Sequence, residues 1–303
     1  MGKEQQRILV TGATGSIGSE VVRALQERDS RIRVLVRNPA HVAHLPDSIE
    51  RVQGDLADPQ TIEAALDGVS AALYVSPHSS DEVTLAENFI SACETRGIRL
   101  VYTGVHIDAP HRWLRALLRF LFGTRFPHYK GKFRISERAL TAKTDSLVLA
   151  PTNYYQNDEL YRQELVSGRF PVPLREANRV DLRDVGDAAA RALTDTSVTP
   201  GAYALVGPTS LSSADCASVW SEVLGTQVRD TSADTAAWTT LLAERLPARK
   251  ATDFEHTYRL LGNMKVPTSP GQLAQTTSLL GRPPRSYTEY VRDTTARWRA
   301  KSS

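Results

Sequence analysis

The chain has 303 residues, of which 37 are basic and 34 are acidic, so its formal net charge at pH 7 is only +3. A hydrophobic content of 41% excludes a disordered or fibrous chain, and the small positive charge gives no support for nucleic-acid binding. Cys93 and Cys216 fit no metal or redox spacing, which predicts buried reduced thiols and no metal site. Because no apolar run is long enough for a signal peptide or a membrane span, we expect a cytoplasmic protein.

The first half of the chain alternates short apolar runs with segments of helical periodicity. Strands are predicted at 7–11, 31–36, 50–52, 70–75, 99–103 and 146–149, and helices at 16–27, 61–66, 82–95 and 132–142. Several strands are apolar at successive positions, which is typical of a parallel sheet covered by helices on both faces. The pattern predicts an α/β fold with a doubly wound parallel sheet of the Rossmann type.

After Pro151 the elements become shorter and prolines more frequent. We expect residues 1–152 to form a dinucleotide-binding Rossmann domain, rejoined by residues 178–207, and residues 153–303 to form a smaller α/β substrate lobe. Strands are predicted at 180–182 and 203–206, and a long loop is predicted at 268–275.

A glycine-rich turn joins the first predicted strand to the first predicted helix. Gly12 permits a tight turn, Gly15 allows close approach of a pyrophosphate, and Gly18 allows the helix to pack on the strand. The helix N-terminus then offers N–H groups to the phosphates. The residues predicted to contact a dinucleotide here are Gly12, Thr14, Gly15, Ser16, Ile17 and Gly18.

Arg37 and Asn38 follow the second predicted strand, at a place where NAD-binding proteins of this fold carry an acidic residue. A guanidinium at this place favours the 2′-phosphate of NADP(H), with NAD(H) as the second choice and a solvent-exposed cation as the alternative. Asp55 and Leu56 follow the third strand and are placed at the adenine. Capping of the next helix is the alternative for Asp55.

Several of these motifs resemble the NmrA-like branch of the atypical short-chain dehydrogenase/reductases. The resemblance extends over nearly the whole chain and is carried by the glycine turn and by residues 36–39, 54–56, 88–92, 101–104, 180–185 and 201–208. It implies a Rossmann fold with a small C-terminal lobe and a preference for NADP(H). It also implies either reductase activity or a nonenzymatic role in sensing the NADPH/NADP ratio, and it does not choose between them.

Short-chain reductases generally pair a tyrosine with a lysine four residues later, but His128 stands four residues before Lys132 here. The resemblance implies that Lys132 is the catalytic residue, as in the related benzylic ether and isoflavone reductases. Because residues four apart share one helix face, His128 is expected beside it. Thr103, which ends the fifth strand, takes the place of the substrate-orienting hydroxyl. The alternatives are a lysine that only binds the ribose and a threonine that is merely buried.

The carboxyl ends of two further strands are also expected to bind ligand, as in other open parallel sheets. The residues placed at the nicotinamide half of the cofactor, besides Lys132, are Val75, Ser76, Pro77, Pro151, Thr152 and Asn153. Those placed at the substrate are His78, His106, Trp113, Tyr154 and Tyr155. Packing inside the lobe is the alternative for the two tyrosines, and a surface loop is the alternative for His78.

A basic amphipathic helix is predicted at 111–126, with an apolar stripe that includes Trp113 and with Arg112, Arg115 and Arg119 beside it. It has three interpretations: a lid or wall of the active site, a contact with a second subunit, or attachment to an anionic membrane surface. Its place beside the predicted nicotinamide pocket favours the lid.

Together these features predict an NADPH-dependent reductase that transfers hydride to an apolar small molecule, either aromatic or not. The acceptor is a ketone, an enone, a quinone or a benzylic ether. The alternative is a non-catalytic redox-sensing regulator that binds NADP(H), and an epimerase or lyase comes third. The expected partners are the small-molecule substrate and a second copy in a homodimer, without nucleic acid and without a membrane span.

Overall fold

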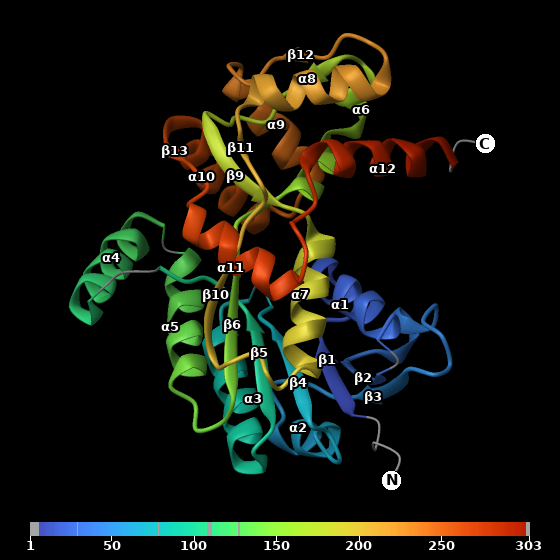
Figure 1. Cartoon of the computed structure of the whole chain (residues 1–303), viewed down its shortest axis with the longest axis vertical. Helices are drawn as coiled ribbons and strands as arrows, with labels where there is room; N and C mark the ends of the chain where they lie inside the picture. Colours follow the sequence, from blue (N-terminus) through green and yellow to red (C-terminus); the bar gives the residue numbers. More distant parts are fainter. Residues whose placement is uncertain (1–5, 29, 78, 108–110, 127, 301–303) are drawn as a thin grey trace. The chain divides into compact units, whose positions relative to one another are not determined.

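The computed structural model describes residues 6–28, 30–77, 79–107, 111–126 and 128–300. The chain folds into two compact units, each of which is built from several segments (Figure 1). Unit 1 contains the described residues of 1–151, 182–205 and 278–281, and unit 2 contains those of 152–181, 206–277 and 282–303.

Seven parallel strands form the sheet of unit 1 in the order β10-β6-β5-β4-β1-β2-β3. The strands are β1 (Arg7–Thr11), β2 (Arg31–Val36), β3 (Glu50–Gln53), β4 (Ala71–Val75), β5 (Arg99–Thr103), β6 (Ser146–Pro151) and β10 (Gly201–Leu205). This order is that of a doubly wound Rossmann sheet extended by one strand, so the predicted fold class is confirmed. The order in which the chain adds strands reverses between β1 and β4, because β2 and β3 lie on one side of β1 and the later strands lie on the other. Sheets of this kind bind ligands at that point.

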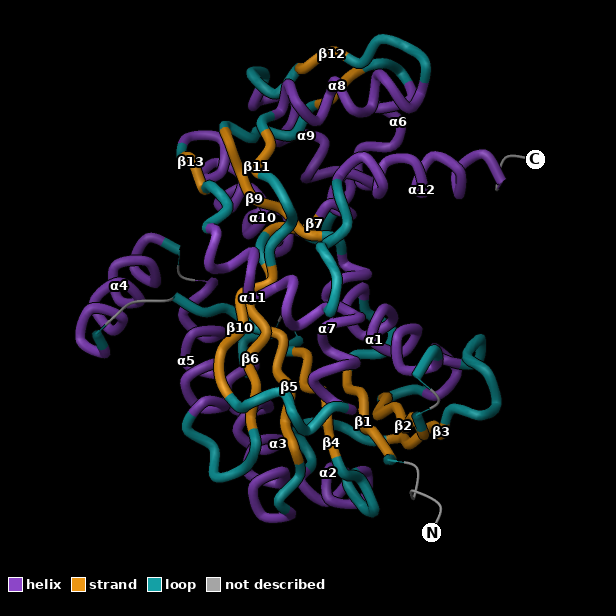
Figure 2. The backbone as a smooth tube through the Cα atoms, viewed as in Figure 1, coloured by secondary structure: helices purple, strands orange, loops and turns teal. Residues whose placement is uncertain are grey.

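Helices cover both faces of this sheet (Figure 2). On one face α1 (Ser16–Gln26) packs against α7 (Leu182–Thr194), and Gly186 permits this because a Cβ there would lie 2.6 Å from the carbonyl oxygen of Glu20. On the other face α2 (Pro59–Ala65), α3 (Glu82–Arg96) and α5 (His128–Leu140) bury a core that includes Phe89, Ile135 and Tyr102. Unit 1 also contains η1 (Pro39–Val42) and α4 (Arg112–Arg125).

Unit 2 combines short strands with helices around a core rich in aromatic side chains. In its sheets, β9 (Glu176–Val180) pairs with β7 (Asn153–Tyr154), β11 (Ser210–Leu211) and β13 (Lys265–Val266), and β8 (Arg169–Phe170) pairs with β12 (Arg229–Asp230). Its helices are η2 (Tyr155–Tyr161), α6 (Arg162–Val166), α8 (Ser213–Leu224), α9 (Thr235–Arg245), α10 (Ala248–Asn263) and α12 (Tyr287–Ala300). An ion pair between Arg179 and Asp158, both 0% exposed, lies inside this core.

Two predicted elements are wrong. The strand at 180–182 is instead the end of β9, which belongs to unit 2, and Leu182 already begins α7. The loop at 268–275 is largely α11 (Pro270–Leu280), because a proline at the first position of a helix loses no hydrogen bond and starts the helix rather than breaking it. The strand predicted at 203–206 is confirmed by β10, which pairs with β6.

Cys93 and Cys216 are buried free thiols, as predicted. Among the described residues, no three acidic, histidine or cysteine side chains are grouped so as to hold a metal ion. None of the described helices is both long enough and apolar enough to cross a bilayer.

Candidate functional site

The glycine-rich turn lies at the point where the strand order reverses, between β1 and β4. The Thr11 hydroxyl donates to the carbonyl oxygen of Leu73 (3.1 Å) and accepts from the N–H of Val75 (3.0 Å). It therefore continues the link between the two strands beyond their last paired residues, Val10 and Leu73. Gly12 follows with a φ of +68°, a conformation that favours glycine, and a Cβ there would lie 3.2 Å from the Cβ of Val75.

The start of α1 leaves room and donors for an anion. Gly18 brings the helix against the turn, since a Cβ at this position would lie 2.2 Å from the carbonyl oxygen of Gly12. Gly15 is the N-cap, no side chain caps the helix, and Thr14, Gly15 and Ser16 are exposed while Ile17 is half-buried. The first N–H groups of α1 are therefore available to a phosphate, so these residues fit the diphosphate of a dinucleotide.

The ends of β2 and β3 hold the residues predicted to select and bind the adenosine half. Arg37 is exposed and forms no ion pair with a described residue, so its guanidinium is available to a phosphate. Asn38 caps η1 by accepting from the N–H of Ala40 (3.0 Å). The side chain that caps α2 is Asp58 and not Asp55, so the exposed Asp55 does not have the capping role considered as its alternative. Leu56 is half-buried and packs on the core.

Lys132 projects from α5 toward Glu82, the first residue of α3. Its Nζ lies 3.2 Å from Oε2 of Glu82, and the same carboxylate oxygen accepts a hydrogen bond from the Ser76 hydroxyl at 3.0 Å. The two charged side chains are only 17% and 12% exposed. Gly131 makes this contact possible, because a Cβ there would lie 2.2 Å from Oε1 of Glu82. The carboxylate thus connects the predicted catalytic lysine to the loop after β4.

Thr103 ends β5 directly opposite Val75 of β4, so it lies on the strand next to the one that leads into Ser76. Its side chain is buried, and Oγ1 has no hydrogen-bond partner among the described residues. Buried hydroxyls are rarely left without a partner in native proteins. An orphaned hydroxyl at the carboxyl end of a central strand therefore fits a group that binds a ligand.

Glu82 was not predicted as a site residue. An acidic residue in the first turn of a helix is common because it complements the positive end of the helix dipole, so its presence carried no functional signal. It is the packing of α3 against α5 that brings it to Lys132, fifty positions away in the sequence.

The remaining residues of unit 1 predicted for the site are described in part. His78 lies outside the described residues, and His128 begins α5, but its side chain also lies outside what the structure describes. Three further residues are half-buried: Pro77 follows β4, His106 follows β5, and Pro151 is the last residue of β6. Trp113 lies on α4 and is 66% exposed.

Four of the predicted site residues belong to unit 2, where they take part in its internal contacts. The hydroxyl of Thr152 donates to Asn178 (3.0 Å), and Oδ1 of Asn153 accepts from the Tyr258 hydroxyl (2.9 Å). The carbonyl oxygen of Tyr154 accepts from Arg179 (2.8 Å). The side chain of Tyr155 is fully buried, with its ring centre 5.0 Å from that of Tyr287, which favours packing over substrate binding for this residue.

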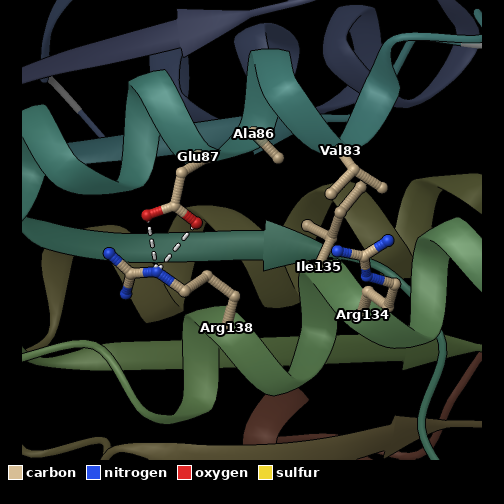
Figure 3. A pocket seen from close by; sticks show the side chains of 6 residues that line it. All are labelled: Val83, Ala86, Glu87, Arg134, Ile135 and Arg138. Atoms are coloured by element: carbon tan, nitrogen blue, oxygen red, sulfur yellow. Dashed lines mark hydrogen bonds and ion pairs between the residues drawn. The ribbon is translucent and has the colours of Figure 1, made fainter.

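A groove on the outer surface of unit 1 lies between α3 and α5 (Figure 3). Arg138 crosses it and donates to both carboxylate oxygens of Glu87 at 2.9 Å. Its volume of about 180 Å³ is below the roughly 300–1,000 Å³ of typical ligand sites. The lining residues are Val83, Ala86, Glu87, Arg134, Ile135 and Arg138, none of which was predicted to bind a ligand.

A doubly wound parallel sheet, with a glycine-rich turn at the point where its strand order reverses, defines the class of Rossmann-fold proteins. The family model of the NmrA-like family matches residues 4–291. The chain therefore belongs to the NmrA-like family, as its motifs suggested.

Comparison with known proteins finds related sequences and several solved structures of similar fold. The chain is 33% identical over 233 residues to the NAD(P)H azoreductase of Xenophilus azovorans, covering 73% of this chain and 75% of that protein. The triphenylmethane reductase of Citrobacter, solved with NADP(H), has a similar structure (TM-score 0.78, 22% identity, 95% and 99% of the two chains). So does NmrA, a negative transcriptional regulator solved with NADP (TM-score 0.71, 17% identity, 96% and 95%).

Proposed function

We propose that the protein is an NAD(P)H-dependent reductase that prefers NADPH and transfers hydride to an apolar, aromatic small molecule. The observation that carries this proposal is the pairing of Lys132 with Glu82 and Ser76 beside the carboxyl ends of β4 and β5. The azoreductase, with 33% identity, supports the reaction class.

The residues of unit 1 fit a dinucleotide at three points. The turn from Gly12 to Gly18 would hold the diphosphate with backbone N–H groups, and Arg37 would bind the 2′-phosphate of NADPH. Asp55 would accept from the adenine amino group. The nicotinamide, once bound, supplies the hydride.

Lys132 and Thr103 have separate roles in this proposal. As hydride reaches the electrophilic carbon of a ketone, enone or quinone, negative charge develops on the oxygen, and the ammonium group of Lys132 stabilises this charge and delivers a proton from Nζ. With a benzylic ether, the C–O bond breaks as hydride reaches the carbon, and the departing oxygen takes this proton. Thr103 orients the substrate by donating a hydrogen bond from its hydroxyl, which has no partner in the described part of the chain. Solvent then returns a proton to Lys132.

Glu82 acts in this reaction as a positioning residue. Its carboxylate holds Nζ of Lys132 at 3.2 Å and the Ser76 hydroxyl at 3.0 Å, so it fixes the lysine relative to the loop after β4. Misplacing a reacting group by about 1 Å can reduce a rate by about 100-fold. A long, flexible lysine side chain depends on such a partner to adopt one geometry.

The substrate class follows from the chemistry that reduction needs and from the relatives. Azo compounds and triphenylmethane dyes, after which two of the similar proteins are named, share an extended aromatic framework with an electrophilic centre. The acceptors proposed for this chain are therefore quinones, enones, aromatic ketones and benzylic ethers, and the test set adds an azo dye and a triphenylmethane dye.

The first experiment follows NADPH oxidation by its absorbance with each of these acceptors. Lys132→Ala should reduce kcat by about 100- to 10,000-fold. The matched control is Lys130→Ala, which removes an exposed lysine from the same helix and should leave kcat unchanged. Equal activity of the Lys132→Ala protein and the wild type would remove this lysine from the mechanism.

The role of Glu82 has its own control within the same pair of helices. Glu82→Gln should lower kcat about 10- to 100-fold and leave the KM for NADPH nearly unchanged. Glu87→Gln breaks another ion pair between α3 and α5, that of Glu87 with Arg138, which also pairs with Glu94 of α3, and should affect neither parameter. If both variants lose activity equally, the carboxylate supports helix packing and not Lys132.

Cofactor preference is tested by titrating Arg37→Glu with both dinucleotides. The Kd for NADPH should rise about 10- to 100-fold, because a charge-assisted hydrogen bond is lost and a like charge is added, whereas the Kd for NADH should change little. Equal losses for the two cofactors would refute the 2′-phosphate assignment.

A redox-sensing regulator is the second candidate function. The observation that favours it is His128 in place of the tyrosine that short-chain reductases use as their acid. Tight NADPH binding without turnover of any acceptor, together with an unchanged Kd in Lys132→Ala, would favour this function over the reductase.

A further inference from the structure

Helix α4 exposes an unusual number of large apolar side chains. Trp113 and Phe120 are 66% and 67% exposed, and Leu117, Leu118 and Leu121 are 46%, 37% and 52% exposed. With about 100° of rotation per residue, Trp113, Leu117, Phe120 and Leu121 lie within an arc of about 100° along one side of the helix. We call these four side chains the apolar face of α4.

The other side of α4 packs against the rest of unit 1. The ring of Phe122 packs against those of Phe126 (4.7 Å between centres) and Phe133 (5.8 Å), and Arg119 forms an ion pair with Glu137 of α5. In Figure 1, α4 lies beside α5 and away from the sheet. The apolar face is therefore not the surface by which α4 packs against its own unit.

The charge around this face is strongly one-sided. Residues 109–136 contain seven lysines and arginines and no acidic residue, although the whole chain has 37 basic and 34 acidic residues. Arginines 112, 115, 119 and 125 all belong to α4 itself. An apolar face within a cationic segment complements a surface that is both apolar and anionic.

A second copy of the chain fits this face poorly. Two α4 helices pairing through their apolar faces would bring Arg112 and Arg125 of each copy together, since these are the arginines nearest the face on the helical wheel, and neither helix offers a carboxylate to pair with them. An anionic lipid bilayer instead provides acyl chains for the apolar residues and phosphates for the arginines, and the interface between them is the preferred place for tryptophan.

We propose that α4 binds the surface of an anionic lipid bilayer, lying in the plane of the interface with its apolar face inserted. Its 14 residues span about 21 Å, which suits an interfacial helix and is too short to cross the bilayer. Each arginine near the surface should strengthen binding about fivefold at low salt.

The test uses the full-length protein with vesicles of phosphatidylcholine alone or mixed with phosphatidylglycerol. Sedimentation should carry the protein down with the mixed vesicles only, and less so at high salt. Trp113 also reports directly, since the other three tryptophans, Trp220, Trp238 and Trp298, are at most 8% exposed. Its fluorescence should shift to the blue with the mixed vesicles, and Trp113→Phe should remove the shift.

The double variant Leu117→Ser, Phe120→Ser removes two exposed apolar side chains. Its affinity for the mixed vesicles should be at least tenfold lower than that of the wild type, and its circular dichroism spectrum should be unchanged. The matched control is Val166→Ser, which removes an apolar side chain that is 62% exposed elsewhere. Absence of binding to mixed vesicles would overturn the proposal. So would a concentration-dependent dimer that the double variant abolishes in the absence of lipid, since a second copy would then cover the face. A higher KM for apolar acceptors without vesicle binding would assign α4 as a lid instead.

Discussion

Removing the carboxylate of Asp158 should destabilise the protein strongly, because it would leave a charged guanidinium buried in unit 2. Nη2 of Arg179 lies 2.5 Å from Oδ1 of Asp158 and Nη1 lies 3.1 Å from Oδ2, which also accepts from the Tyr287 hydroxyl. Burial alone would lower the pKa of Arg179, but the charge of Asp158 raises that pKa well above its usual value. Arg179 therefore stays charged inside the folded protein.

The expected size of this effect follows from the burial of both partners. Breaking a buried ion pair by removing one partner costs about 3–5 kcal/mol of the free energy of unfolding. With about 2 °C per kcal/mol for a chain of 303 residues, Asp158→Ala should lower Tm by about 6–10 °C. The control is Glu222→Gln, whose partner Arg292 lies 3.4 Å away with both side chains more than 60% exposed, and which should cost less than about 1 kcal/mol.

Urea denaturation followed by circular dichroism measures these differences. The double variant Asp158→Leu, Arg179→Met should recover more than half of the loss, because neither charge then remains in the core. A loss below about 1 kcal/mol for Asp158→Ala would refute the argument. A double variant as unstable as Asp158→Ala would show that packing, rather than the unpaired charge, sets the cost.

Four further predictions concern the two cysteines and two glycines. Burial raises the pKa of Cys93 and of Cys216 to about 12, so both thiols should resist a thiol reagent at about pH 8 until the protein is unfolded. Because these values exceed the unfolded value of about 8.5, stability should be fully retained below that pH and fall as the pH rises toward 12, as denaturation at several alkaline pH values would show. Gly18→Ala should raise the Kd for NADPH at least tenfold in a titration, since its Cβ would lie 2.2 Å from a backbone oxygen. Gly131→Ala should displace the carboxylate of Glu82 and reproduce the loss of kcat of Glu82→Gln, and an unchanged kcat would contradict the geometry assigned to this pair.

The sheet of unit 1 was predictable because each strand is marked locally. The bounds of β1, β2 and β5 agree with the predicted ranges, since buried parallel strands are apolar on both faces and their flanks are polar. In unit 2, β7, β8, β11, β12 and β13 have two residues each, and two residues are too few to show a period. Their pairing is decided by contacts between distant segments, which no local pattern records.

The residues predicted to bind the dinucleotide and those predicted to bind the substrate could be inferred from the sequence to different degrees. The glycine turn has a fixed spacing, so its position at the reversal of the sheet followed from the sequence alone. Tyr155 showed the limit of this reasoning, because an aromatic residue has the same sequence signal whether it packs in a core or binds a substrate. The placement of the substrate lobe at 153–303, the homodimer and the cytoplasmic location stay predictions.

The contact between Lys132 and Glu82 bears on the choice between reductase and sensor. For a protein that only binds the dinucleotide, the roles proposed for the glycine turn and Arg37 would suffice together with a lysine that reaches the ribose, and that lysine would need no carboxylate partner. Burying two charges to 17% and 12% exposure costs desolvation that their mutual attraction does not always offset. Gly131 adds a further cost, because glycine in a helix is less favourable than alanine by about 1 kcal/mol, and a Cβ at this position would lie 2.2 Å from Oε1 of Glu82. An arrangement that lowers stability in two ways while fixing one ammonium group beside the carboxyl end of the sheet favours a catalytic role for that group.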